Sequence, residues 1–206
     1  MIWISCLILS REHKKITFLK LTIIFRNSAV SSLFGARYQG FIEEMLVSPM
    51  HPGTILLGYI IGGMARGLVV GSLVLLVALF FTSMTIQHIF LTFIIAIITN
   101  VLFSAAGFIN ATLSKKFDDV TIIPTFILTP LTYLGGVFYS VDYLPESLRW
   151  LCYLDPIYYI INEFRYAILD IREVNFWLNM SVLCIFTFLF TGIAYYLLSK
   201  GKVQSI

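Results

Sequence analysis

The 206-residue sequence is poor in charge, since only 12% of its residues are Asp, Glu, Lys or Arg. An ordinary soluble domain carries about 25%. Hydrophobic residues make up 59%, and the mean hydropathy is +0.90. A soluble domain of this length cannot bury that much apolar surface. The composition therefore excludes a soluble enzyme, a nucleic-acid-binding protein and a disordered chain, and it predicts an integral membrane protein.

Motifs that carry catalytic or metal chemistry are missing as well. The three cysteines are far apart and form no CxxC pair, so they predict neither a disulfide framework nor a metal site. The three histidines are scattered. The one Gly-Lys pair, Gly201-Lys202, lacks the upstream glycines of a phosphate-binding loop, and neither HExxH nor GxSxG occurs. We expect no metal site, no directly bound cofactor and no catalytic residue in this chain.

Long apolar runs are what the sequence does contain. Four of them reach the roughly 20 residues that a helix needs to cross the hydrocarbon core: 55–82, 89–112, 121–141 and 176–199. The short, uncharged turn Ser83–His88 makes the first two an antiparallel hairpin, and Pro124 and Pro130 interrupt the third. We therefore predict an all-α, polytopic helical membrane protein with four transmembrane helices.

Lys and Arg alternate between the two sides of these predicted spans. Six precede the first span, two lie in the loop 111–120, two lie in the tail, and none lies in the hairpin turn. The segment 142–175 carries three, which its acidic residues outnumber. By the positive-inside rule, both termini and the loop 111–120 are predicted to be cytoplasmic, while the hairpin turn and 142–175 are external.

The segment before the first span divides into two parts. Residues 1–30 are atypical, because the apolar stretches Met1–Leu9 and Ile16–Phe25 are too short to span and the positive charges follow the first of them. Phe34–Val47 instead predicts an amphipathic cytoplasmic helix with Phe41 on its apolar side, ended by Pro49. Its polar side carries Arg37, Glu43 and Glu44. This helix either docks a soluble partner or simply anchors the first span at the interface.

Small residues recur at four-residue spacing within the first span, at Gly63, Gly67 and Gly71. Such spacing lets another helix approach closely, within the chain or across a dimer. Arg66 lies in the same run, and two interpretations stay open for it. It lines a polar pathway or pairs with an acid, or its side chain extends to the cytoplasmic headgroups.

The stretch 135–170 is too polar to span and too apolar to lie free in water. We predict an amphipathic helix that begins near Pro156, with Asp155 as its N-cap, and a shorter helix after Pro145. The apolar face of the longer helix is Ile157, Ile160, Ile161, Phe164 and Ile168. These helices dip into or lie on the outer leaflet, or the stretch is an external loop with an aromatic belt.

Acidic residues are nearly absent from the predicted spans, which disfavours a secondary carrier driven by protons or sodium. If the protein moves a substrate, the energy must then come from a separate subunit.

Three phrases in the sequence resemble the permease subunit of ABC type-2 transporters, with the multidrug-type exporters as the nearest subgroup. They are GFIEEMLVSPMHPGTILLGYIIGG, PTFILTPLTYLGGVFYSVDYLP and LDPIYYIINEFRYAI, and the likeness covers Ser31–Ser199. The resemblance implies a bacterial cytoplasmic-membrane exporter of two permeases and two ATPases, in which the ATPases bind ATP. It also implies that Arg37–Pro49 is the coupling helix, which seats in the ATPase, and that Leu144–Asp170 is a re-entrant external helix pair. That pair would include Pro145, Asp155, Pro156, Glu163 and Arg165.

One departure from the family concerns the N-terminal end. Intact members carry about two further helices before the coupling helix, so we expect residues 1–30 to be atypical and 31–206 to form an N-terminally truncated permease domain. The alternative to an exporter subunit is therefore a permease fragment or membrane anchor without transport activity.

Overall fold

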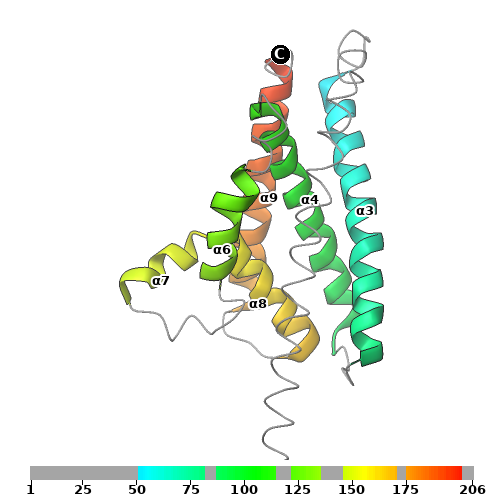
Figure 1. Cartoon of the computed structure of the whole chain (residues 1–206), viewed down its shortest axis with the longest axis vertical. Coiled ribbons are helices and arrows are strands. Elements are labelled where there is room, and N and C mark those ends of the chain that lie inside the picture. The colour runs from blue at the N-terminus through cyan, green and yellow to red at the C-terminus, as the bar shows by residue number, and fades with distance from the viewer. Residues whose placement is uncertain (1–50, 82–86, 115–121, 136–145, 171–174, 201–206) are drawn as a thin grey trace, which may run out of the picture.

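The computed structural model describes residues 51–81, 87–114, 122–135, 146–170 and 175–200, and within these ranges the regular structure is entirely helical (Figure 1). The predicted segment 1–30 and the predicted coupling helix, with Arg37, Phe41, Glu43, Glu44 and Pro49, lie outside the described residues, as does Pro145. The elements are α3 (Pro52–Phe81), α4 (Ile89–Leu113), the π-helical turn η1 (Ile123–Leu128), α6 (Thr129–Leu134), α7 (Glu146–Tyr153), α8 (Pro156–Leu169) and α9 (Phe176–Ser199).

Three of the helices are long and apolar enough to cross a membrane: Pro52–Leu76 of α3, Ile89–Leu113 of α4 and Phe176–Ser199 of α9. A 25-residue helix is about 37 Å long, which exceeds the hydrocarbon thickness. The three pack against one another as a bundle, with α4 and α9 in the most extensive contact (Figure 1). The prediction of a polytopic helical membrane protein is confirmed.

The third predicted span, 121–141, is described only over 122–135 and forms two short pieces there. Its prolines give the physical reason. Pro130 has no N–H to donate to the carbonyl four residues earlier, and its ring crowds that carbonyl. The wider π-helical turn Ile123–Leu128 lies directly before it and accommodates both effects. A fourth span stays a prediction.

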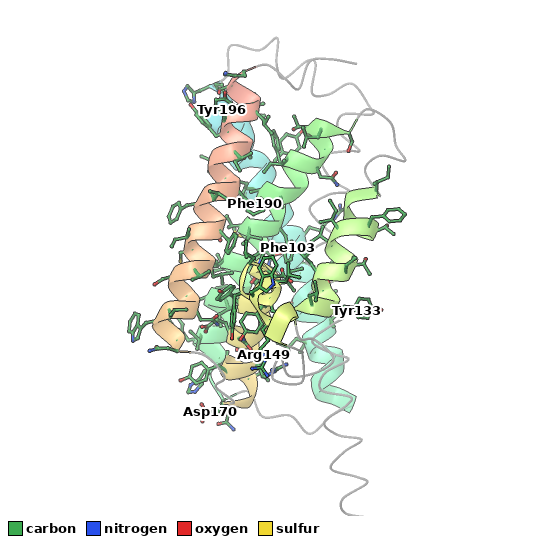
Figure 2. The ribbon with its side chains drawn as sticks, turned by 90° about the vertical axis from the view of Figure 1, so that its left-hand side faces the viewer. Phe103, Tyr133, Arg149, Asp170, Phe190 and Tyr196 are labelled. Carbon is green, nitrogen blue, oxygen red and sulfur yellow. The ribbon has the colours of Figure 1, made fainter. Side chains whose placement is uncertain are left out.

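Helix α8 lies inside the bundle, against α4 and α9 and in the lower half as drawn in Figure 1. All five residues of its predicted apolar face are buried, with 4% or less of each exposed. They form the main hydrophobic core with residues of α4 and α9, among them Ile95, Phe103 and Leu183. Figure 2 shows Phe103 midway along the bundle, far from Asp170 at one end and Tyr196 at the other.

A second core cluster joins α3, α4 and α9 directly, without α8. Its members are Leu56, Ile60, Phe108, Ala111, Ala194 and Leu198. The bundle therefore has one end where three long helices meet and another where α8 is inserted between them.

Candidate functional site

The start of α8 is fixed by the N-cap that the sequence predicts. The Asp155 carboxylate accepts a hydrogen bond from the Ile157 N–H at 2.9 Å, and Pro156 occupies the first helical turn. Asp155 is only 3% exposed and lies outside the three spanning helices. Burial raises the pKa of its carboxyl from 3.8 to about 7, although the Ile157 N–H acts in the opposite direction.

Helix α7 is hydrogen-bonded to α8 and to α6 through its last two residues. The Tyr159 hydroxyl donates to the Tyr153 carbonyl at 2.8 Å, which joins α8 to the end of α7. The buried Cys152 thiol donates to the Leu134 carbonyl at 3.1 Å, which joins α7 to α6. The predicted pair of short helices is therefore present, and one member of it is packed within the bundle rather than lying in an external loop.

In the middle of α8, a hydrogen bond between two polar side chains joins this helix to α9. The Asn179 amide of α9 donates to Glu163 Oε1 at 2.8 Å and to the Tyr159 carbonyl at 3.2 Å. Glu163 is 1% exposed and Asn179 2%. Arg165, two residues further along α8, is partly exposed instead.

The last turn of α8 contacts the first residues of the α4 segment. The His88 N–H donates to the Ala167 carbonyl at 3.0 Å, and His88 Nε2 lies 3.5 Å from Asp170 Oδ1. The His88 ring also lies 5.5 Å from the Tyr166 ring. Asp170 ends the helix in the left-handed conformation with φ 55°, and Figure 2 places it at the lower tip of the molecule.

An apolar cavity of about 350 Å³ opens between α3, α4 and α8. Its polar side chains include Ser72 and Thr92, whose hydroxyls donate to carbonyls of their own segments, Val69 and His88, at 2.9 Å each. The wall offered to an occupant is therefore hydrocarbon. The remaining lining residues include Gly71, Leu75, Phe93, Ala96, Phe164 and Ile168.

Five of the glycines of α3 lie in two stripes. Gly63, Gly67 and Gly71 are buried on the side of α3 that packs in the bundle. Gly58 and Gly62 are exposed, and a Cβ added at either would meet nothing within 4 Å. Arg66 is also exposed, so it lies off the buried stripe. Both interpretations of Arg66, a role in a polar pathway or ion pair and an extension to the cytoplasmic headgroups, stay predictions.

Sequence reasoning identified α8, its cap and its apolar face, but it missed the contacts that α8 makes. Asn179 received no role, although an amide three residues into an apolar span is a signal of helix-to-helix hydrogen bonding. For His88 the sequence predicts only a place in the hairpin turn, among histidines too scattered to form a metal cluster. The described residues contain no cluster of His, Cys, Asp or Glu that could hold a metal ion.

Comparison with known proteins gives the family. The family model described as ABC-2 type transporter matches residues 14–169 of this chain. The chain belongs to the ABC-2 type transporter family. This ABC-2 protein is 44% identical over 175 residues to the inner membrane transport permease YadH of Escherichia coli K12, an alignment that covers 85% of this chain and 68% of the relative.

Two further relatives extend the comparison. YadH of Shigella flexneri aligns over the same lengths with the same identity. Nodulation protein J of Sinorhizobium fredii (strain NBRC 101917 / NGR234) is 24% identical over 197 residues, which cover 92% of this chain and 73% of the relative. As a member of this family, the chain is a membrane permease of an ABC transporter.

Proposed function

We propose that this chain is the membrane subunit of an ATP-driven exporter in a bacterial inner membrane, working with a separate cytoplasmic ABC ATPase. The observation that carries the proposal is the family match over 14–169, which includes the predicted coupling helix and the α7–α8 pair. The name of the E. coli relative, an inner membrane transport permease, supports the location. The sequence itself offers no phosphate-binding loop, so ATP would bind to the partner.

The proposed working unit contains two copies of the permease and two ATPases, with both permease termini in the cytoplasm. Closure of the ATPases on ATP would shift the permease pair between inward-facing and outward-facing states. The ATPase would dock on the helix Phe34–Val47, through residues such as Glu43 and Glu44. The predicted spans are apolar almost throughout, which is compatible with a hydrophobic or amphipathic substrate.

The proposal is tested by purification of the full chain with its cognate ABC ATPase, followed by transport in inverted vesicles. The probes are a fluorescent phospholipid, a hydrophobic cationic dye and an oligosaccharide. We expect ATP-dependent uptake of at least one probe. Uptake that needs no ATP but stops when the ion gradient is collapsed would instead establish a secondary carrier.

The docking site is tested separately by Glu43→Ala together with Glu44→Ala. We expect the double variant to lose the co-purifying ATPase while inserting normally into the membrane. Glu146→Ala, on the predicted external side, is the control because it is the same Glu-to-Ala change, with the loss of one negative charge, away from the coupling helix. Equal recovery of the ATPase with both variants would refute docking at this helix.

A further inference from the structure

The Glu163–Asn179 pair joins two helices through polar side chains in the apolar interior of the bundle. Both residues are at least 98% buried, and their neighbours Ile160, Phe164 and Leu183 belong to the main hydrophobic core. One amide of α9 holds two successive turns of α8, because Asn179 Nδ2 donates to the carbonyl of Tyr159 and to the carboxylate of Glu163.

Several other polar side chains of the long helices form hydrogen bonds within their own helix. The Asn100 amide donates to the Ala96 carbonyl at 2.8 Å, and the hydroxyls of Thr187 and Thr191 donate to carbonyls four residues earlier. Each of these bonds closes within one helix. They do not hold neighbouring helices together, whereas the Glu163–Asn179 pair does.

The physical consequence is a difference in how easily each contact separates. Between helices in lipid there is little hydrophobic drive, so apolar faces can shift with small loss as long as packing is kept. Separating the two helices would leave the buried Asn179 amide without the two acceptors that it has on α8, the Tyr159 carbonyl and the Glu163 carboxylate. The α8–α9 contact is therefore expected to stay closed while other contacts rearrange.

We propose that Glu163 and Asn179 are positioning residues that make the α7–α8 pair and α9 move as one body during the transport cycle. The part of this proposal that concerns transport rests on the proposed function. Helix α8 is linked to α7 by the Tyr159–Tyr153 bond, so a shift of α9 would carry both short helices with it. The relative motion would then fall between this body and α3, across the apolar cavity.

Hydrogen–deuterium exchange of the full chain in lipid nanodiscs tests the link without any transport assay. In Glu163→Leu and in Asn179→Leu, we expect the amides of residues 157–169 to exchange about tenfold or more faster than in the wild type. Asn100→Leu is the matched control, since it removes an equally buried amide whose bond lies within one helix. Glu163→Gln keeps the acceptor oxygen and is expected to exchange as the wild type does.

Exchanging the two residues provides a second variant that stays informative if a leucine variant does not fold. Glu163→Asn and Asn179→Glu are each expected to accelerate exchange, while the double variant, with the pair reversed, restores slow exchange. Leucine variants that exchange like the wild type, or a reversed pair no better than its single variants, would overturn the proposal.

Coupling is measured on the same variants in complex with the ATPase, using whichever probe the wild-type complex transports. We expect the leucine variants to hydrolyse ATP at a rate within about twofold of the wild type. The amount of probe moved per ATP should fall at least fivefold in these variants. It should return to the wild-type value in Glu163→Gln. Unchanged transport per ATP despite faster exchange would make the pair purely structural and would also overturn the positioning role. If the wild-type complex transports none of the probes, the proposed function fails, and the exchange data alone decide whether the link exists.

Discussion

The two ends of the bundle are held together by different chemistry. Where α3, α4 and α9 meet directly, a cluster of apolar residues that includes Leu56, Phe108 and Leu198 forms the core. Where α8 is inserted, apolar packing is combined with the Asp155 cap, the Glu163–Asn179 pair and the His88 contacts. Hydrogen bonds have a preferred geometry, whereas the hydrophobic effect is non-directional. The end with α8 therefore has directional contacts in addition to its apolar packing.

The largest effect is expected from removing the core side chain of the α8 end. Phe164→Ala deletes a ring that is 2% exposed and is expected to destabilise the fold by about 3–5 kcal/mol, because the site cannot fully collapse. Unfolding by SDS in mixed micelles measures the change. Phe188→Ala, on a side chain that is 79% exposed, is the control and should have little effect. Equal losses would mean that α8 is not the centre of the core.

The glycine stripes of α3 test whether the apolar contacts need close approach. Gly67→Leu is expected to cost about 1–3 kcal/mol, because Gly67 is buried and a larger side chain there must displace its neighbours. Gly62→Leu adds the same atoms on the exposed stripe, where space is open. The same unfolding assay compares the two. A greater loss from Gly62→Leu would show that the exposed stripe is covered in the assembled protein.

Two substitutions of Asp155 separate the contribution of its hydrogen bond to stability from the contribution of its charge. Asp155→Ala removes the acceptor for the Ile157 N–H and is expected to cost about 1 kcal/mol, whereas Asp155→Asn keeps an acceptor. The pKa of Asp155 is raised from 3.8 to about 7 on folding, so ionisation works against the fold. Wild-type stability should then fall as the pH rises from 4 to 7, and this dependence should be weaker in Asp155→Asn. An identical pH profile for the two proteins would contradict the raised pKa.

The smallest effect is expected at the tip of the molecule. The side chains of His88 and Asp170 are 44% and 62% exposed, so their pairing contributes less than about 1 kcal/mol. His88→Ala keeps the backbone bond to Ala167 and should change stability only slightly, as measured by the same unfolding assay. A loss of stability comparable to that of Phe164→Ala would show that the contacts of His88, and not the buried core, stabilise the α8 end most.

Local patterns were sufficient to predict α8 because its apolar residues and its cap lie close together in the sequence. The buried face Ile157 to Ile168 and the cap at Asp155 are confirmed. The link between Glu163 and Asn179 could not be predicted in the same way, since it depends on the packing of two helices whose paired residues are 16 positions apart. Glu163 lies at the edge of the apolar face, where an acidic residue is normally expected to meet solvent.

The third span shows a different limit of sequence reasoning. Hydropathy averages over a window and treats 121–141 as one apolar run, but it does not describe how prolines alter helix geometry. The π-helical turn before Pro130 is a local response to a missing donor and a crowded ring. The predicted coupling helix depends on the family resemblance and lies outside the described residues.

The apolar cavity is a part of the bundle whose walls can shift without the loss of hydrogen bonds from its lining hydroxyls. Its two hydroxyls are bonded within their own segments, so a change in its volume breaks no hydrogen bond involving Ser72 or Thr92. The space of about 350 Å³ is open at the surface of the bundle, so an apolar group from outside can enter it without breaking the hydrogen bonds of Ser72 or Thr92. The width between α3 and α8 can therefore adjust to what fills it, whereas the close-packed α8–α9 contact cannot.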